Sequence, residues 1–476
     1  MKCPQPRRRD SVVRICRWSI VCCSILFLSA SAALAKDARV PSIAARPFDQ
    51  SEDTMVFQGY FTGKYTYRTA GAAGSAGRDQ DAVTELRLDV SRPRTNAYEF
   101  HFFGAVRDEL SNRLKTGDAF TPLADAGNTY ASRAHGYLYE AHLDLNNPFG
   151  RVTQVRIGRQ DGTRDEPVFF DGIAADISLA SRLGMTAYGG TAVHLYELNN
   201  HPGDNSLQGA GLDILASSLT LVSIDFLHTD GQQDLFDATG HHDQLVSLRL
   251  NQRFSPNLRT NAKIRYVNGA PRDMNLRVAA TAPDLGLETN AAYARQFRVQ
   301  NELSNELSPY YEVLGQSDPY QSYDISLRKF IGARYTVDLG YFQRSLINQG
   351  QENVFNHSFQ RIYAVFDIND LFTSNLTLSL TGEQWRSTPQ NVNSAGFDLG
   401  YAFRSGRRSP KLSIGSYYSL YKNDFTTSLG ERSHVRTYYL KGEYPFARHY
   451  AISGEYDLEK GTLEYQTARM AVRYDF

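Results

Sequence analysis

The residue types needed for nucleophilic catalysis lie close together in Asn356-His357-Ser358. A histidine beside a hydroxyl suggests a hydrolase, in which the imidazole would act as base. Such catalysis needs a base that a third group orients, and His357 lacks the flanking glycines that we would expect at this kind of site. We therefore predict that the chain is not an enzyme, and a hydrolase stays as the least favoured alternative.

Two further segments carry side chains of the kind that bind cations. One holds His241, His242 and Asp243 after Asp230, Asp234 and Asp237, and the other holds Asp161, Asp165 and Glu166. Adjacent residues of a strand point to opposite sides, so neighbours such as these do not converge on one ion. We interpret both segments as solvated loops and predict no metal and no cofactor.

Charged side chains recur instead at every second position through much of the chain. Leu248 and Leu250, for example, alternate with Arg249, Asn251 and Arg253. The segments 85–90, 261–266 and 411–421 alternate in the same way. Successive side chains of a strand point to opposite faces, so each segment has one apolar face and one charged or small face.

A soluble β-sandwich would also alternate, but three features favour a membrane. The segments are about 10–12 residues long, as a tilted membrane-crossing strand requires. The pattern continues from residue 54 to residue 476 without a helical segment, and 29 Tyr and 26 Phe could supply aromatic girdles. The connections also come in two lengths. We predict an all-β, antiparallel transmembrane β-barrel over 54–476.

The connections fix the strand count. Short ones are rich in turn residues, at 91–93, 146–148, 255–257 and 445–447. Long polar ones lie near 69–80, 107–134, 160–168, 199–206, 229–243, 346–357, 386–395 and 423–433. Long and short alternate except between roughly 270 and 330. Because both chain ends should share one side, we merge two segments there and predict about 22 strands, with 20 or 24 as alternatives. The short turns should be periplasmic and the long loops extracellular.

The charged faces are predicted to line the interior. Each charge would cost about 2–4 kcal/mol facing lipid at mid-membrane, and charges of both signs in the interior would make it wet and bias which ions pass. An equally weighted alternative is that these charges pair with one another across the barrel and only hold its shape. The candidate channel-lining residues are Glu85, Arg87, Asp89, Arg156, Arg249, Arg253, Lys263, Arg265, Asp324, Arg328, Arg469 and Arg473.

The N-terminus has the pattern of a cleaved secretory signal over residues 1–35. Basic residues precede the apolar run 18–28, and Ala33-Leu34-Ala35 fits a signal peptidase site. Residues 36–53 are expected to form a periplasmic lead-in. All four cysteines, at positions 3, 16, 22 and 23, fall inside the signal, so disulfides and thiolate chemistry are excluded from the mature chain. Without the signal the charge is 45 − 50 = −5, which argues against nucleic acid as a partner.

The last strand alternates in its own way and ends on an aromatic residue. Met470, Val472, Tyr474 and Phe476 share one face. This pattern resembles the C-terminal signal that the outer-membrane barrel-assembly machinery reads, and an unpaired strand edge is a template for pairing. We expect that machinery and outer-membrane lipid as partners, and oligomers are an open alternative.

Three stretches resemble a known superfamily: Tyr137-Leu138-Tyr139-Glu140-Ala141, Val155-Arg156-Ile157-Gly158-Arg159-Gln160 and Phe170-Asp171-Gly172. They are similar to a recurrent segment of large Gram-negative outer-membrane porin-like barrels, of the alginate-export type and of porin–cytochrome conduits. The resemblance implies a channel. The acids in Asp161–Glu166 depart from the basic continuation of the alginate type, which disfavours polyanion export.

These observations lead to one expected function and one main alternative. We expect a channel in the outer membrane of a Gram-negative cell that passes ions or small hydrophilic solutes passively, with the 107–134 loop as candidate constriction. The alternative is a barrel that sheathes a multihaem c-type cytochrome in an electron conduit, because about 22 strands exceed the 16–18 of porins.

Overall fold

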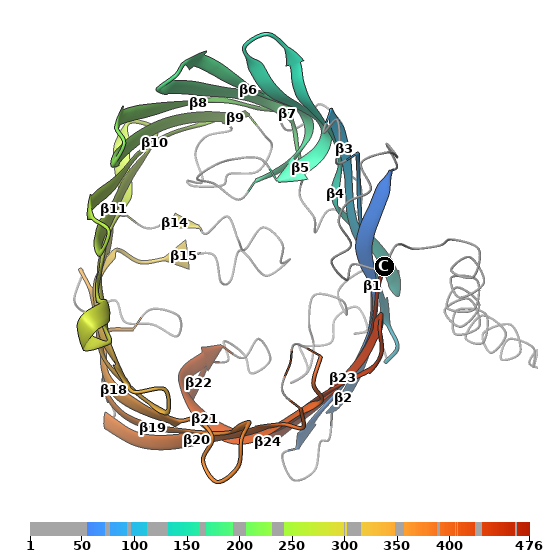
Figure 1. The fold of residues 1–476 in the computed structure, drawn as a ribbon, viewed down its shortest axis with the longest axis vertical. Coiled ribbons are helices and arrows are strands. Elements are labelled where there is room, and N and C mark those ends of the chain that lie inside the picture. Colours follow the sequence, from blue (N-terminus) through green and yellow to red (C-terminus); the bar gives the residue numbers. More distant parts are fainter. Residues whose placement is uncertain are drawn as a thin grey trace, which may run out of the picture. The chain divides into compact units, whose positions relative to one another are not determined.

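The computed structural model describes residues 55–476 with gaps at 72–76, 93–96, 112–131, 162–167, 194–205, 231–241, 299, 302–315, 348–356, 388–390, 405, 407, 424–430 and 462–463. The signal and lead-in predicted for 1–53 lie outside these residues. Within the described part, no helix is long and apolar enough to cross a membrane. The 22-stranded sheet is a closed antiparallel barrel (Figure 1), as the sequence predicts.

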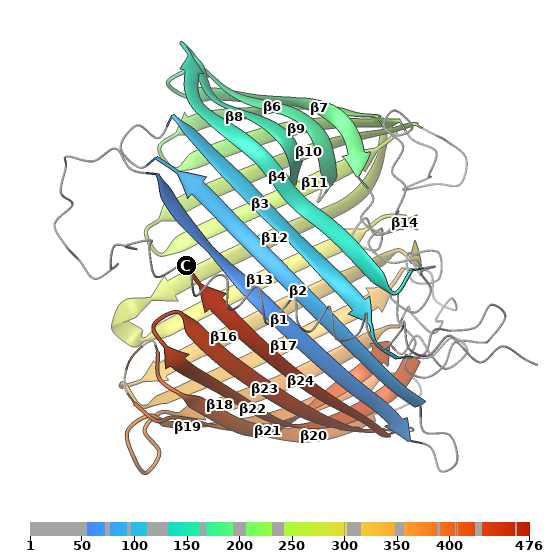
Figure 2. The ribbon, with the colours of Figure 1, turned by 90° about the vertical axis from the view of Figure 1, so that its right-hand side faces the viewer.

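The strands of the barrel follow one another in chain order around the ring (Figures 1 and 2). They are β1 (Val56–Gly71), β2 (Gly77–Ser91), β3 (Tyr98–Glu109), β4 (Ala134–Phe149), β5 (Val152–Asp161), β6 (Phe169–Ala180), β7 (Leu183–Val193), β8 (Ser206–Ser217), β9 (Thr220–Asp230), β10 (His242–Ser255), β11 (Leu258–Val267), β12 (Ala270–Ala282), β13 (Leu287–Gln296), β16 (Tyr320–Ile331), β17 (Tyr335–Leu346), β18 (Phe359–Ile368), β19 (Leu376–Ser387), β20 (Asn391–Ala402), β21 (Lys411–Asn423), β22 (Glu431–Ala447), β23 (Tyr450–Lys460) and β24 (Glu464–Asp475).

The first and last strands close the barrel. β1 pairs with β2 on one side and with β24 on the other, from Tyr60 opposite Asp475 to Gly71 opposite Glu464. Beyond the last pair, the amides of Gly59 and Phe476 each donate to the other's carbonyl at 3.1 Å. The predicted closure of the terminal strand on a strand beginning near residue 54 is therefore confirmed, and the sheet has no free edge.

The structure between residues 270 and 330 explains why long and short connections do not alternate there. The η1 turn (Pro283–Leu285) joins β12 to β13, and the chain then leaves the barrel before it returns as β16. The intervening β14 (Gln300–Asn301) and β15 (Gln316–Ser317) pair only with each other. These two short strands lie at the poor turns of this region and outside the barrel sheet, so the predicted total of 22 is confirmed.

The two ends of the barrel differ in their connections (Figure 2). At one end, here called the short-turn end, β4–β5, β8–β9 and β10–β11 are joined by two-residue turns. Two predicted turns are misplaced: β4 continues to Phe149 and β22 to Ala447, because register shifts carry each strand past its Asn or Pro residues. The predicted long connections lie at the other end, the long-loop end, but the one predicted at 386–395 is only the three residues between Ser387 and Asn391. The long-loop end also has one tight turn, Asn268-Gly269, with φ of 52° and 77°, as a type I′ hairpin requires.

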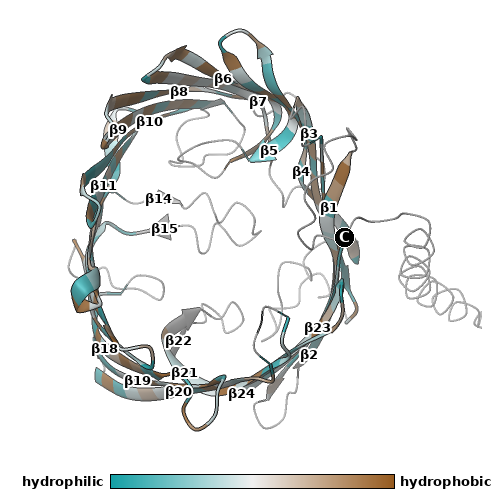
Figure 3. Ribbon diagram, in the orientation of Figure 1, coloured by the Kyte–Doolittle hydropathy of each residue, from teal (hydrophilic) through white to brown (hydrophobic). Residues whose placement is uncertain are grey.

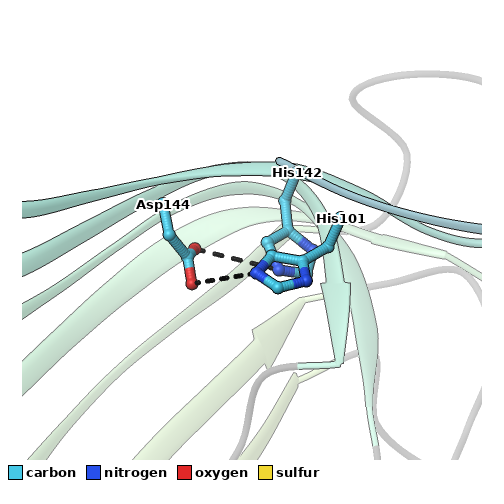
Figure 4. A group of neighbouring side chains, drawn as sticks. All are labelled: His101, His142 and Asp144. Atoms are coloured by element: carbon cyan, nitrogen blue, oxygen red, sulfur yellow. Dashed lines mark ion pairs between the residues drawn. The ribbon is translucent and has the colours of Figure 1, made fainter. Parts of the chain in front are cut away.

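Hydrophobic and hydrophilic residues are interspersed along the strands (Figure 3), and strand geometry turns their alternation into two chemically different faces. Large apolar side chains stand exposed on one face, among them Phe57 (57%), Ile173 (54%) and Met470 (57%). The register places charged residues on the other face, for example Arg87 opposite Tyr60 and Glu455 opposite Arg469. His101, His142 and Asp144 belong to this second face, and they point to the inside of the barrel (Figure 4). The exposed apolar face is therefore the outside.

Candidate functional site: the inner wall of the barrel

All twelve predicted lining residues fall on the inner face. The cross-strand pairs make this explicit: Arg249 lies opposite Lys263, and Arg328 lies opposite Asp338. Their side chains are thus positioned by strand alternation and register alone. What differs from residue to residue is the partner, and this divides the wall into compensated and uncompensated regions.

The wall of β1 to β5 is compensated by ion pairs along its whole height. At the long-loop end, Asp79, Asp81 and Glu109 are buried together. Arg68 binds both aspartates, at 2.7 Å from Asp81, and Arg107 lies 3.1 Å from Asp81. Two arginines among three carboxylates make this a structural ion network, since buried charges are stable only when paired.

The same wall remains paired toward its middle and its short-turn end. Lys64 lies 2.5 Å from Glu85, and Arg87 lies 3.3 Å from Asp89. These contacts give a partner to every predicted lining residue of β2. Closer to the short-turn end, Arg156 holds the buried Asp144 through two hydrogen bonds of 2.8 and 3.0 Å. That planar two-point geometry is the strongest form of such a pair.

Other sectors are paired in a similar way. Arg265 donates to Asp273 at 2.7 and 2.8 Å, and Arg328 donates to Asp338 at 2.7 and 3.1 Å. In the terminal strand, Arg469 pairs with Asp457 and Arg473 with Asp475. The interpretation that charge pairing holds the barrel's shape therefore applies to most of the predicted lining residues.

One region of β10, β11 and β12 has no such compensation. Arg253 stands directly opposite Arg259, and Arg277 stands opposite Asn261 on the next strand. Among the described residues, no acidic side chain forms an ion pair with these three arginines, which we call the basic patch. Together with Asn251, Asn261 and Asn290 they line a hollow of about 590 Å³. Like charges directly opposite each other are destabilising, so the patch is not explained by stability.

Sequence reasoning found only Arg253 of the basic patch. Arg259 extends the face of Asn261, Lys263 and Arg265 by one step toward the turn, and a longer alternation window would have included it. Arg277 shares the inner face of β12 with Asp273 and Asn275. The alanines that follow Arg277 weaken the polar–apolar alternation of this strand, so the face on which Arg277 lies becomes clear only from the strand register.

The inner face also carries an apolar cluster that the sequence did not predict. Phe170, Tyr188, Leu207, Leu227, Leu245 and Val267 are buried together, with Val168 and Ala192, toward the long-loop ends of β6 to β11. These residues sit on the inner face by register, for instance Phe170 opposite Gln160. The sequence named only charged lining residues and gave no sign of this cluster, because isolated apolar residues at strand ends escape an alternation test.

The stretches that carry the superfamily resemblance have a structural explanation. Gly158, Gly172 and Gly190 form a row across β5, β6 and β7. Gly158 has φ of 124°, and a Cβ there would lie 2.3 Å from the carbonyl oxygen of Ala141. Only glycine adopts this backbone so close to its neighbour, so the glycines of this segment serve strand packing.

The described members of the enzymatic and metal candidates have other contacts. Ser358 accepts a hydrogen bond from the amide of Leu346 at 3.1 Å, which gives its hydroxyl a role at the start of β18. His242 lies 3.0 Å from Asp230, and both are largely exposed. Asn356, His241, Asp234, Asp237, Asp165 and Glu166 lie outside the described residues.

No protein-family model and no curated protein matches the chain. Among solved structures, the chain is similar to OpdQ of Pseudomonas aeruginosa, with 11% identity and a TM-score of 0.40 over 89% of this chain and 97% of that one. It is similar to a BenF-like porin of Pseudomonas fluorescens Pf-5, with 10% identity and a TM-score of 0.37 over 88% and 98%. It is also similar to the P pilus usher translocation pore PapC, with 12% identity and a TM-score of 0.40 over 88% and 99%. At TM-scores below 0.5 these likenesses assign no function. The fold is established by the register of the strands.

Proposed function

We propose that this chain is a passive channel in the outer membrane of a Gram-negative cell, open to ions and small hydrophilic solutes. The observation that carries the proposal is a closed sheet of 22 strands with apolar side chains outside and charged side chains inside. Closure satisfies the backbone hydrogen bonds of every strand, which is the requirement for crossing lipid.

The size of the sheet supports an aqueous interior. With a strand spacing of about 4.8 Å and a tilt of about 40°, a closed sheet of 22 strands has a backbone radius on the order of 20 Å. Side chains of the wall just fill a barrel of about 8 strands. The inner side chains of this wall are thus too short to close it by themselves, and water enters wherever no other chain segment stands.

Selectivity is assigned to the charges that lack a partner. A paired arginine presents almost no net charge to a passing ion, whereas the basic patch presents three positive charges around one hollow. Fixed charges along a pore bias which ions pass, so the patch should favour small anions over cations. The predicted constriction by the 107–134 loop falls mainly on residues outside the described part and stays a prediction.

Swelling of proteoliposomes tests the proposal. Purified chain is reconstituted, and the vesicles are diluted into isotonic solutions of uncharged sugars of increasing size. Rapid swelling with the smallest sugar and none with the largest supports a water-filled channel of limited width. Folded protein that causes no swelling with any of them contradicts it.

The same interior would admit a partner protein, so haem staining of the purified preparation accompanies the experiment. A multihaem cytochrome that co-purifies in equal amount would favour the sheath function. Swelling by a haem-free preparation would favour the channel.

A further inference from the structure

Two histidines and one carboxylate converge on the inner face of β3 and β4, toward the short-turn end. His101 and His142 are direct cross-strand partners, and Asp144 lies two residues further along β4. The three side chains point toward one another (Figure 4). One possible ligand atom from each lies within 4.8 Å of the other two. The prediction of no metal rested on two other segments and did not consider these three residues, which are brought together only by the pairing of β3 with β4.

Hydrogen bonds donated by the Nδ1 atoms orient both imidazole rings. His142 Nδ1 lies 3.2 Å from the carbonyl oxygen of Arg159 and must donate, since a carbonyl only accepts. His101 Nδ1 lies 2.7 Å from Asp89 Oδ1 and donates to that carboxylate. In a neutral ring whose Nδ1 carries the proton, Nε2 offers a lone pair. Metal-binding histidines are held in the same way, with the second nitrogen bonded to a carboxylate or a carbonyl.

The two Nε2 atoms face Asp144 across a gap that no hydrogen bond fills. His142 Nε2 lies 3.8 Å from Asp144 Oδ1, and His101 Nε2 lies 3.9 Å from Oδ2. Both distances exceed a hydrogen bond. Ligands of a tetrahedral zinc ion with bonds of about 2.0–2.1 Å stand about 3.3 Å apart. The two rings stack with their centroids 4.9 Å apart and their planes at 29°, so both must rotate to direct their Nε2 lone pairs at one ion in a gap of this size.

The contacts of Asp144 leave one of its oxygens able to coordinate. Oδ2 accepts from Gln154 Nε2 at 2.9 Å and from the terminal nitrogen of Arg156 at 3.0 Å, which uses both of its lone pairs. Oδ1 accepts from Arg156 Nε at 2.8 Å and keeps one lone pair. Oδ1 is also the oxygen nearer to His142. Arg156 thereby fixes the carboxylate and leaves its free position directed at the histidines.

We propose that His101 Nε2, His142 Nε2 and Asp144 Oδ1 form a site for a divalent transition cation such as Zn²⁺ or Co²⁺. Imidazole with carboxylate suits these ions, whereas Ca²⁺ and Mg²⁺ prefer oxygen ligands alone. The fourth position is taken by water or by Glu99, whose Oε2 lies 3.5 Å from His101 Nε2. His142 and Asp144 are buried while His101 is partly exposed, so the ion reaches the site from the lumen.

Titration of the purified full-length barrel with Co²⁺ tests the proposal without any transport measurement. Visible absorption reports coordination of the ion by nitrogen, and calorimetry with Zn²⁺ gives the stoichiometry. We expect one ion per chain. No absorption change up to millimolar Co²⁺ with folded protein would overturn the site.

His142→Ala should weaken binding at least about 100-fold, because one of three protein ligands is lost. His242→Ala is the matched control: His242 stacks on His228 with ring centroids 6.3 Å apart and lies beside Asp230, but that group does not converge. The affinity of the His242→Ala chain for Co²⁺ should equal that of the parent chain. Equal binding by His142→Ala and the parent chain would overturn the proposal.

Asp89→Asn separates coordination from mere structure and also serves if His142→Ala fails to fold. Asp89 contributes no ligand atom but orients the His101 ring, and loss of such a partner costs about 10–100-fold in metal affinity. Folding of each variant is checked by the shift in gel migration on heating. A folded Asp89→Asn chain that binds Co²⁺ as tightly as the parent would contradict the assigned role of His101.

Discussion

The β1–β5 wall and the basic patch on β10 to β12 are built by the same strand alternation, yet their charges are arranged in opposite ways. On β1 to β5, lysine and arginine stand beside acidic partners, as Lys64 does beside Glu85 and Arg156 beside Asp144. On β10 to β12, Arg253 faces Arg259 and the third arginine, Arg277, faces an asparagine. The net charge that a solute meets therefore depends on pairing and not on the number of charged residues.

This difference separates two tasks of one inner wall. A compensated wall stabilises the sheet and gives little field, whereas an uncompensated patch costs stability and gives a local field. Five variants or conditions distinguish these tasks, and we describe them from the largest expected effect to the smallest.

Arg68→Ala should have the largest effect on stability. It leaves Asp79, Asp81 and Glu109 buried beside Arg107, which pairs with Asp81. Removing one member of a buried ion network costs about 3–5 kcal/mol, here discounted to about 3 because the Arg68 side chain is 25% exposed. Urea unfolding in lipid vesicles measures this loss of stability.

Arg328→Ala is the control for that experiment. Its pair with Asp338 has the same short geometry, but the Arg328 side chain is 51% exposed. An exposed pair contributes up to about 1 kcal/mol. Equal losses of stability in the two variants would show that burial does not determine how much an ion pair stabilises this wall.

Changing Arg253, Arg259 and Arg277 together to Gln should alter selectivity and raise stability slightly, by up to about 1 kcal/mol, because the repulsion between Arg253 and Arg259 is lost. Removing three uncompensated positive charges should raise the potassium-to-chloride permeability ratio by at least about threefold. The reversal potential in a KCl gradient measures this ratio. An unchanged ratio would show that the basic patch does not face the ion pathway.

The anion preference of the parent channel should fade with salt. The Debye length falls from about 10 Å at 0.1 M to about 3 Å at 1 M, so the field of the patch no longer reaches the middle of a lumen this wide. Reversal potentials at a fixed concentration ratio but increasing total salt follow the decay. A preference that persists at 1 M would point to direct contact in a narrow passage.

The smallest effect is expected from exchanging Lys64 and Glu85. The double variant Lys64→Glu with Glu85→Lys keeps the pair and the net charge, and both side chains are at least partly exposed. Stability should change by less than about 1 kcal/mol and the permeability ratio should not change. A clear shift in that ratio would mean that paired charges also act on ions.

The sequence predicted the fold well because alternation is a local property. Leu248, Arg249 and Leu250 reveal their faces without any knowledge of their neighbours, and the register keeps Arg249 and Lys263 on one face as the alternation predicts. The strand count followed from loop lengths alone. The two misplaced turns fell where register shifts occur, near Phe149 and Ala447, and a bulge leaves no clear signal in the sequence.

Partners across strands could not be predicted in this way. That Arg156 meets Asp144, that Arg253 meets Arg259, and that His101 meets His142 all depend on the stagger of neighbouring strands. A shift of register by two residues would keep every face and change every pair. The division of the wall into paired and unpaired regions therefore needed the structure.

Single-channel recording of the purified parent chain in a planar bilayer tests the central claim most directly. An open lumen lined by charges predicts discrete, ohmic conductance steps whose reversal potential in a KCl gradient lies on the anion side. A silent bilayer that demonstrably contains folded barrel would contradict the proposal that the interior is a passage for ions.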